Sequence, residues 1–334
     1  CGTIEPSPPS PSPTARSVAA DTPTAPPTSE ATDITLPEPT AIPAAESGEE
    51  EHPLYLSVIW HQHQPVYFKD PDTGVYAKPW VRVHAAKDYV DMAAMLEQYP
   101  DVHATFNLTP SLIRQLDDLT AGARDRYWLM TEIPADRLTD EEKTFIRDRF
   151  FDTNPKVIAR FPRYQEIADG RGNSESWDAG TWRDLQVLFN LAWTDPDWLA
   201  QEPLKALVEK GRDFSEEDKV TILDEHQRLV EETIPVHQRL QESGQIEVTM
   251  TPYAHPILPL LIDTNLARIS MPKASLPPRF SFPRDAVIQA ERGVELYRQH
   301  FGVDPTGMWP AEGAVAEEMV GIAGRNGLAS WMAS

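Results

Sequence analysis

Short β-prone runs alternate with amphipathic segments along most of this 334-residue chain, and this alternation constrains its fold more than any other feature. Strands and helices in regular succession favour parallel strands joined by helical crossovers, because each parallel strand must start from the same end of the sheet. We therefore predict an α/β fold. The expected strands cover residues 54–60, 102–108, 246–251, 306–309 and 328–333, and the expected helices cover residues 88–98, 285–301 and 315–325, with a further helix that opens at 109–111.

A long helical insertion interrupts the alternation after the second strand. Residues 118–244 contain no convincing strand pattern, and their apolar residues recur at helical spacing. Because only five strands are expected in all, they do not close a barrel by themselves. The helices expected in the insertion cover residues 141–151, 182–193 and 216–243, and the prolines expected to punctuate it are Pro155, Pro162, Pro196 and Pro235.

The start of the chain differs sharply in composition from the rest. Residues 1–50 hold 11 of the 32 prolines and no aromatic residue, whereas all nine tryptophans come later. A segment with so few large apolar side chains buries too little surface to offset the entropy of ordering its backbone. We predict a disordered Pro/Ser/Thr-rich tether over residues 1–52 and one large α/β domain over residues 53–334.

The single cysteine is residue 1, and it is followed by glycine and then by the tether. This N-terminus resembles that of a mature bacterial lipoprotein, in which the first cysteine carries the lipid. The resemblance implies an extracytoplasmic protein at the cell surface that touches the membrane only through the lipid on Cys1. An arbitrary fragment start is the alternative. No run of 18 apolar residues is present, so no membrane span is expected.

The acidic balance of the chain limits the class of its partners. The formal net charge is −22, with a pI near 4.7. Such a charge repels the phosphates of nucleic acid, so we expect no nucleic-acid partner. It is compatible with a neutral substrate such as a carbohydrate, and equally with simple solubility.

The strongest candidate for chemistry is Glu312, in the run Gly-Met-Trp-Pro-Ala-Glu-Gly at residues 307–313. This run follows an expected strand, and catalytic residues of α/β barrels gather at the carboxyl ends of strands. Pro310 and Gly313 restrict and then turn the backbone around the carboxylate, and Trp309 offers a flat face for a sugar ring. A carboxylate near the start of the following helix would be the purely structural alternative.

Histidines lie at two other expected strand ends. His61 and His63, in Trp60-His-Gln-His-Gln-Pro65, are two residues apart, so their side chains point to the same face of a continuing strand. His255 lies between two prolines after the third expected strand, and Asn107 at the end of the second is a weaker candidate. These histidines could bind sugar hydroxyls, pack in the core, or hold zinc. For zinc, His61 and His63 would need a third ligand, such as His255 or Asp285.

Three of these segments, in this order, resemble motifs of glycoside hydrolase family 57. The first is His-Gln-His-Gln-Pro at residues 61–65, the second is Val-Thr-Met-Thr-Pro-Tyr-Ala-His-Pro at 248–256, and the third is the run at 307–313. Residues 106–112 and 182–186 are also similar to family sequences. The likeness covers essentially everything after residue 53.

The resemblance implies an incomplete (β/α)7-type barrel, a retaining mechanism and α-glucan substrates, without a metal or organic cofactor. By the same resemblance, Glu312 is the catalytic nucleophile. His61, His63 and His255 line the subsite for the reacting glucose, and Trp60 and Trp309 shape its walls.

The chain departs from the family pattern at its end. A fourth motif, whose first catalytic residue is an aspartate, is expected directly after the strand at 328–333, and the sequence given stops at Ser334. We therefore expect this chain to be a truncated catalytic domain that lacks its acid/base. Two alternatives remain open: a metal-dependent carbohydrate deacetylase or mannosidase, and a lipoprotein that binds glucan without cleaving it.

Overall fold

The computed structural model describes residues 54, 56–328, 330 and 331. The predicted tether and Cys1 lie outside the described residues, so the tether and the lipid anchor remain predictions. Within the described residues, none of the helices combines the length and the apolar character that a membrane crossing demands.

The described strands pair in parallel, and their order in space follows their order in the chain. Strands β1, β2 and β3 form one sheet, β4 and β5 pair separately, and a parallel bridge between Met250 and Met308 links β3 to β4. The predicted α/β class is therefore confirmed. The bounds are β1 (Ile59–Gln62), β2 (Ala104–Leu108), β3 (Ile246–Thr249), β4 (Gly307–Met308) and β5 (Ser330–Trp331).

The first strand starts later than the sequence pattern indicates and runs two residues further. Residues 56–58 are apolar enough for a strand, but regular pairing with β2 begins at Ile59 and continues through His61 and Gln62. The partner strand thus sets the register. As a result, the first histidine of the motif lies on the strand itself and not in the loop after it.

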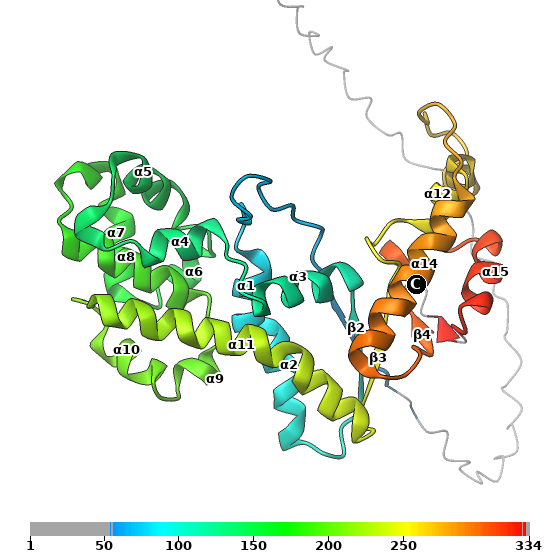
Figure 1. Ribbon diagram of the computed structural model, residues 1–334, viewed down its shortest axis with the longest axis horizontal. Coiled ribbons are helices and arrows are strands. Elements are labelled where there is room, and N and C mark those ends of the chain that lie inside the picture. Colours follow the sequence, from blue (N-terminus) through cyan, green and yellow to red (C-terminus); the bar gives the residue numbers. More distant parts are fainter. Residues whose placement is uncertain (1–53, 55, 329, 332–334) are drawn as a thin grey trace, which may run out of the picture. The chain divides into compact units, whose positions relative to one another are not determined.

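Helices pack around the sheet in the order that the alternation predicts (Figure 1). The helix predicted at 88–98 begins earlier, at Trp80, and contains a π-helical turn. Thr109 caps α3 by accepting a hydrogen bond from the backbone N–H of Leu112, as its position before Pro110 suggests. The bounds are α1 (Trp80–His84), the π turn η1 (Ala85–Tyr89), α2 (Val90–Ala94), η2 (Met95–Gln98), α3 (Pro110–Thr120), α12 (Leu258–Ile262), η5 (Thr264–Leu266), α13 (Ala267–Ser270), α14 (Pro283–Phe301), η6 (Ala311–Gly313) and α15 (Glu317–Arg325).

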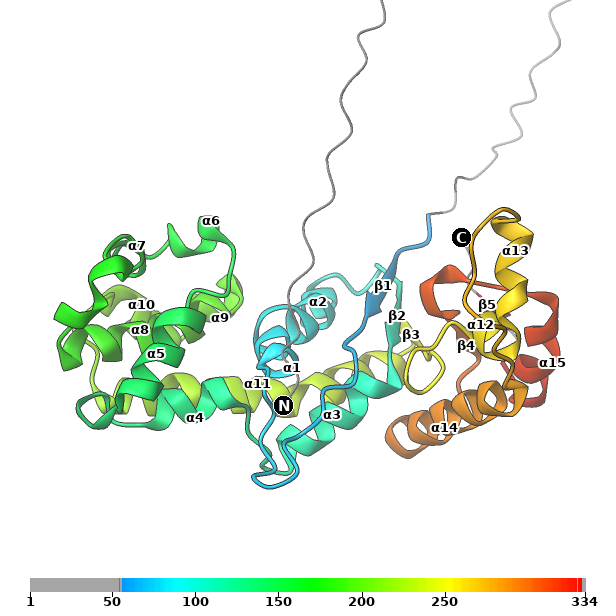
Figure 2. The same ribbon diagram turned by 90° about the horizontal axis from the view of Figure 1, so that it is seen from above.

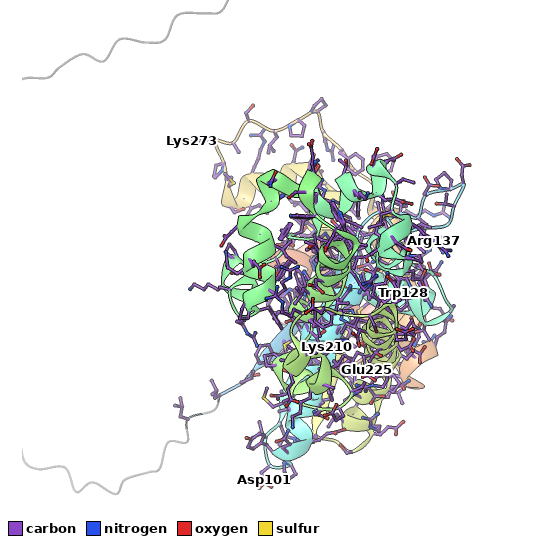
Figure 3. The ribbon with its side chains drawn as sticks, turned by 90° about the vertical axis from the view of Figure 1, so that its left-hand side faces the viewer. Asp101, Trp128, Arg137, Lys210, Glu225 and Lys273 are labelled. Atoms are coloured by element: carbon purple, nitrogen blue, oxygen red, sulfur yellow. The ribbon has the colours of Figure 1, made fainter. Side chains whose placement is uncertain are left out.

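The segment between α3 and β3 is helical, as predicted, and no strand occurs among its described residues. We call residues 125–215 the helical region; Figure 3 faces it, with Trp128 of α4 and Lys210 of α10 labelled. Its elements are α4 (Arg126–Glu132), η3 (Ala135–Arg137), α5 (Asp140–Arg149), α6 (Pro155–Ile158), α7 (Pro162–Asp169), η4 (Arg171–Ser176), α8 (Ala179–Ala192), α9 (Pro196–Leu199) and α10 (Leu204–Lys210), and α11 (Glu216–Glu242) follows it.

Helix α11 joins the helical region to the sheet. It contacts α8 and α10 of that region, and also α2, α3 and β3 (Figure 2). With 27 residues it is about 40 Å long. Helix α11 matches the helix predicted over residues 216–243, and because it continues through Pro235 this proline does not punctuate the insertion as expected. Pro155, Pro162 and Pro196 do begin helices, at the position where a missing N–H costs nothing.

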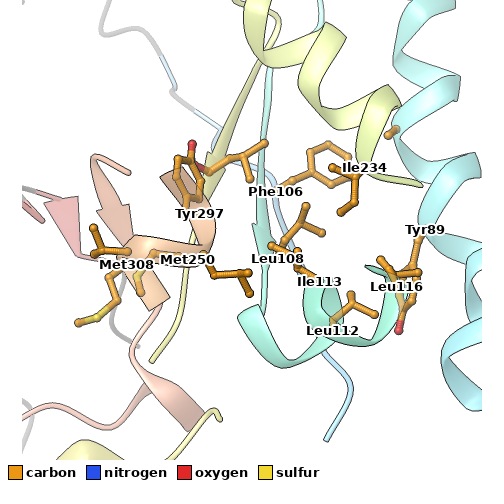
Figure 4. Close-up of a cluster of buried hydrophobic side chains, with 14 of the residues drawn as sticks. Tyr89, Phe106, Leu108, Leu112, Ile113, Leu116, Ile234, Met250, Tyr297 and Met308 are labelled. Carbon is orange, nitrogen blue, oxygen red and sulfur yellow. The ribbon is translucent and has the colours of Figure 1, made fainter. Parts of the chain in front are cut away.

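Two apolar cores hold the described fold together. One lies between the sheet and its helices and includes Phe106, Leu108, Leu112 and Tyr297 (Figure 4). The other lies within the helical region and includes Phe150. Truncating one such fully buried side chain to alanine costs about 2–5 kcal/mol.

Helix α14 packs very closely on the end of β3, and one residue permits this. A side-chain carbon at Gly293 would lie 2.3 Å from the terminal methyl of Met250 and 2.8 Å from the carbonyl oxygen of Thr251. Only glycine therefore fits at this point of α14 without a shift. The close packing fixes the loop that follows β3, which carries His255.

Candidate active site

A row of hydrogen bonds crosses the carboxyl ends of β1, β2 and β3. The strand register aligns His61 with Asn107 and Asn107 with Thr249. The Asn107 amide nitrogen donates to the Thr249 hydroxyl over 3.0 Å, and its oxygen lies 2.7 Å from Nδ1 of His61. Because that oxygen only accepts, Nδ1 of His61 carries the proton. The Nε2 atom of the neutral ring is then an acceptor.

Three histidine rings and one indole gather at this edge of the sheet. The ring centroids of His63 and His255 are 4.1 Å apart, and that of His61 lies 5.7 Å from His63 and 5.2 Å from His255. The Trp309 ring lies 5.6 Å from His61. We call these four residues and Glu312 the strand-end cluster. Segments far apart in the sequence thus meet at one place, as expected for the carboxyl ends of parallel strands.

Glu312 presents its carboxylate openly beside this cluster. Its side chain is 66% exposed, and its Oε1 atom lies 3.7 Å from Nδ1 of His255. Helix α15 begins only at Glu317, so Glu312 is not in the first turn of that helix. The helix-start alternative therefore does not describe its position.

The backbone is strained at two residues of the strand-end cluster. Among the described non-glycine residues, His255 (φ 55°), Glu312 (φ 57°) and Asp213 (φ 56°) have positive φ. A non-glycine residue in this left-handed region costs about 1–3 kcal/mol and persists only where surrounding contacts enforce it. Two of the three positions fall in the candidate site. Gly313, directly after Glu312, also has a positive φ and continues the turn.

Burial and the neighbouring imidazoles lower the pKa values of His255 and His63. Desolvation, followed by the nearby His63 and His61, lowers the pKa of His255 to about 4. Desolvation and His61 also lower the pKa of His63, although Glu312 opposes this shift. Neutral imidazoles both donate and accept hydrogen bonds, which is the capacity that sugar hydroxyls require.

One nitrogen of the cluster has no partner within the described fold. The Nε2 atom of His255 is buried and makes no hydrogen bond, and the whole side chain is only 4% exposed. A buried polar atom without a partner costs about 1–3 kcal/mol. A ligand hydroxyl would satisfy it, so the atom marks a place where a ligand fits the chemistry of the site.

A supporting set of hydrogen bonds holds the loop after β1. Gln64 is buried; its amide donates to the hydroxyl of Tyr89 over 2.8 Å and accepts from that of Tyr67 over 3.0 Å. The Ser111 hydroxyl donates to the backbone oxygen of Gln64 over 2.8 Å. These bonds fix the backbone next to His63. On the other side, Gln289 of α14 accepts hydrogen bonds from the loop that carries His255.

Trp60 takes a different position from the other predicted site residues. It pairs in register with Phe106, on the face of the sheet opposite to His61, and is 42% exposed. The described rings include no contact between Trp60 and the cluster. Its predicted role as a wall of the glucose subsite remains a prediction.

The geometry gives the zinc alternative no ligand set among the described residues. The one group there of three or more acidic, cysteine or histidine side chains whose ligand atoms all lie within 4.8 Å of one another is Asp91, Asp195 and Asp197, and it includes no histidine. Asp285 lies exposed at the start of α14.

Three supporting residues of the site were not predicted from the sequence. Gln64 and Thr249 lie within the first and second motifs, where they are buried and hold the histidines in place, and Tyr89 comes from the π turn. Thr249 could have been found from the strand register, because it pairs with Asn107. The contact between Gln64 and Tyr89 depends on helix packing, for which no sequence pattern exists.

Comparisons with known proteins identify a family and several similar structures. The family model described as Glycosyl hydrolase family 57 matches residues 57–333. A search of curated proteins found no match. Similar solved structures include the alpha-amylase AmyC of Thermotoga maritima, with 15% identity, a TM-score of 0.42, and coverage of 83% of this chain and 39% of that chain.

Two branching enzymes of the same family are also similar. That of Thermococcus kodakaraensis has 17% identity and a TM-score of 0.36, with coverage of 78% of this chain and 33% of that chain. That of Pyrococcus horikoshii has 15% identity and a TM-score of 0.36, with coverage of 78% and 34%. This chain therefore spans less than two fifths of the length of these three proteins.

Proposed function

Because the chain belongs to glycosyl hydrolase family 57, we propose that it is a retaining glycoside hydrolase or transglycosylase of α-glucans that uses Glu312 as its nucleophile. One observation carries the proposal. Glu312 extends an exposed carboxylate after the end of β4, held in a strained backbone conformation, with its Oε1 atom 3.7 Å from Nδ1 of His255. An exposed, fixed carboxylate beside hydrogen-bonding rings suits attack on a sugar.

The proposed reaction proceeds in two displacements. A carboxylate oxygen of Glu312 bonds to the anomeric carbon as the bond from that carbon to the leaving oxygen breaks, and the leaving oxygen takes a proton. Water, or a hydroxyl of a second glucan, then attacks the same carbon, gives up its proton and releases the Glu312 carboxylate. Two inversions retain the configuration.

The other residues of the cluster bind and orient the sugar in this proposal. His61, with Nδ1 bonded to Asn107, offers Nε2 to a hydroxyl, and the unpartnered Nε2 of His255 takes a second one. Trp309 supplies an apolar face for the pyranose ring. Binding the sugar in this way fixes the anomeric carbon next to the Glu312 carboxylate. Such positioning lowers the activation free energy and is a major part of enzymatic rate acceleration.

The proton donor is not assigned to a described residue. Glu312 is the one carboxylate in the described part of the chain within ion-pair distance of His61, His63 or His255. In this proposal, the expected acid/base aspartate follows the strand predicted at 328–333. The strands that would complete a (β/α)7 barrel follow it as well.

A substrate that needs no general acid tests the nucleophile by itself. Fluoride leaves α-maltosyl fluoride without protonation, so the first displacement requires only Glu312 and the binding groups. We expect residues 1–334 to release fluoride at a measurable rate, and Glu312→Gln to lower that rate by about 10³-fold or more. Wild-type activity that survives in Glu312→Gln would refute the proposal.

The same assay separates the proposal from its alternatives. A lipoprotein that only binds glucan would bind maltosyl fluoride without releasing fluoride. Reducing-sugar release from soluble starch then tests whether residues 1–334 lack the acid/base, a loss that would cost about 10²–10⁴ in rate. Rapid starch hydrolysis by residues 1–334 would show that the proton donor lies within them.

A further inference from the structure

A groove on the helical region lies away from the strand-end cluster. It is lined by residues of α5, η4 and α8 and has a volume of about 380 Å³, within the range of small-molecule sites. Figures 1 and 2 place α5 and α8 near one end of α11, whereas β3 lies at the other end of this helix of about 40 Å. We call it the α5–α8 groove. The residues that line it are Asp140, Lys143, Thr144, Arg147, Ser174, Glu175, Trp177 and Trp182.

Two tryptophans form the aromatic part of this groove. Trp182 is buried, and Trp177 packs edge-on against it with ring centroids 4.7 Å apart. Trp177 is partly exposed and occupies an extended position between η4 and the start of α8. Asp178 caps α8 directly after it, so the backbone that carries Trp177 is fixed on both sides. A rigid indole at a groove binds an apolar ring face at low entropic cost.

Polar groups with unused hydrogen-bonding capacity surround the tryptophans. Within the described residues, the side chains of Lys143, Asp140 and Glu175 make no ion pair or hydrogen bond with another residue, and Lys143 is partly buried. Arg147 bonds only to the exposed Asp148 beside it, over 2.8 Å. Two basic and two acidic groups therefore face one groove and balance in charge.

This combination selects a class of ligand. Balanced charges favour neither an anion nor a cation, and the net charge of −22 disfavours anions further. Donors and acceptors around an aromatic face match a neutral polyhydroxylated ring. We propose that the α5–α8 groove is a second binding site for a neutral glycan, and that it holds a distant part of the α-glucan chain whose other part reaches the strand-end cluster. The identity of the glycan as an α-glucan rests on the proposed function.

Two sites on one polymer act together. Once one part of a glucan is bound, a second part is present at a high effective concentration, so affinity for the polymer exceeds that for a short oligosaccharide. The groove should therefore matter for glycogen and not for maltosyl fluoride, which is too short to reach both sites.

Electrophoresis through gels that contain glycogen, with the full 334-residue chain, tests this. We expect glycogen to retard the wild type, Trp177→Ala to weaken this binding by about 10-fold or more, and Lys143→Ala to weaken it less. The Lys143→Ala variant keeps the test valid if Trp177→Ala misfolds. The ammonium group of Lys143 pairs with no described side chain, so its removal should leave the fold intact. Tyr99→Ala is the matched control, because Tyr99 is an aromatic residue with 55% exposure outside the groove, and it should bind as wild type does.

The two proposals fail separately. Wild-type retardation that persists in both Trp177→Ala and Lys143→Ala, or a wild type that glycogen does not retard, overturns the second site. Trp177→Ala should still release fluoride from maltosyl fluoride at the wild-type rate; a parallel loss of that activity would make Trp177 a structural residue and also overturn the inference. If the wild type releases no fluoride but its retardation depends on Trp177, the second site stands and the nucleophile proposal falls.

Discussion

Two polar networks that each include a histidine, one between the helical region and helices α1 and α11 and the other in the strand-end cluster, differ in how far their hydrogen bonds are satisfied. Under the helical region, Arg82 is 2% exposed, pairs with Asp125 over 2.6 Å and donates to Asn190 and to Nδ1 of His226. The other nitrogen of His226 bonds to Thr194. Every member of this Arg82 network has a partner.

The strand-end cluster leaves bonding capacity unused and backbone strain unrelieved. Nε2 of His255 has no partner, the Glu312 carboxylate is 66% exposed, and both residues have positive φ. The difference teaches how to tell a structural polar network from a site. The Arg82 network satisfies its polar groups within the fold, whereas the strand-end cluster holds its groups in position with part of their bonding left open.

The largest expected effect is the loss of the Arg82 network. Arg82→Met would leave the Asp125 carboxylate buried without its partner, so we expect the free energy of unfolding in urea to fall by about 3–5 kcal/mol. Arg298→Met is the control, because its ion pairs are exposed to solvent, and it should leave the free energy of unfolding nearly unchanged. A small effect at Arg82 would mean that the network does not support the fold.

Two buried asparagines compare the regions directly. Asn107→Ala and Asn190→Ala each leave buried partners unpaired, so each should lower the free energy of unfolding by about 1–3 kcal/mol. Only Asn107→Ala should also slow fluoride release per folded molecule, by about 10-fold, because His61 loses the bond that fixes its proton on Nδ1. Equal activity in the two variants would remove the distinction between the regions.

Acid should destabilise the protein partly through the network. Burial, and then the Arg82 guanidinium, lower the pKa of His226 well below its ordinary 6.5. Below about pH 6.5 the unfolded chain therefore binds a proton at His226, whereas His226 of the folded protein stays unprotonated. The free energy of unfolding falls as the pH is lowered below 6.5. This loss of stability begins as the pH falls through about 6.5 and grows as it falls further.

Urea unfolding at several pH values measures this effect as a slope. His226→Gln should give a flatter dependence of the unfolding free energy on pH than the wild type, whatever its stability at neutral pH. An unchanged slope would show that His226 does not resist protonation in the folded protein.

The smallest expected effect concerns backbone strain at the site. Glu312→Gly should raise the free energy of unfolding by about 0.5–1 kcal/mol, because glycine adopts positive φ without strain and only part of that gain is offset by its greater freedom when unfolded. Asp213→Gly should change stability less, since a short polar side chain tolerates this conformation better. Thermal denaturation compares them, and a destabilised Glu312→Gly would argue against strain at the nucleophile.

Periodicity and strand-end position were sufficient to predict the α/β class, the helical insertion and the meeting of three motifs. Each of these depends on local patterns, or on the rule that parallel strands end at one edge. The prediction placed His61, His63, His255 and Trp309 together, and the described structure brings them into ring contact.

Other features depend on tertiary contacts, and local patterns do not encode these. The late start of β1 follows from its register with β2. The opposite orientation of Trp60 follows from a strand register that includes His61, whereas the sequence pattern ended the strand at Trp60 itself. The positive φ of Glu312 is a consequence of the turn between β4 and α15, which no residue preference specifies for a glutamate.

The central claim is that the carboxylate of Glu312 bonds to the anomeric carbon of a sugar. A 5-fluoro-α-glycosyl fluoride that forms the glycosyl–enzyme quickly and releases it slowly tests this most directly, with mass spectrometry of the intact protein and of its peptides. The account predicts one added glycosyl group, located on Glu312 and absent from Glu312→Gln. A label on any other carboxylate, or no label on a protein that still releases fluoride, would contradict it.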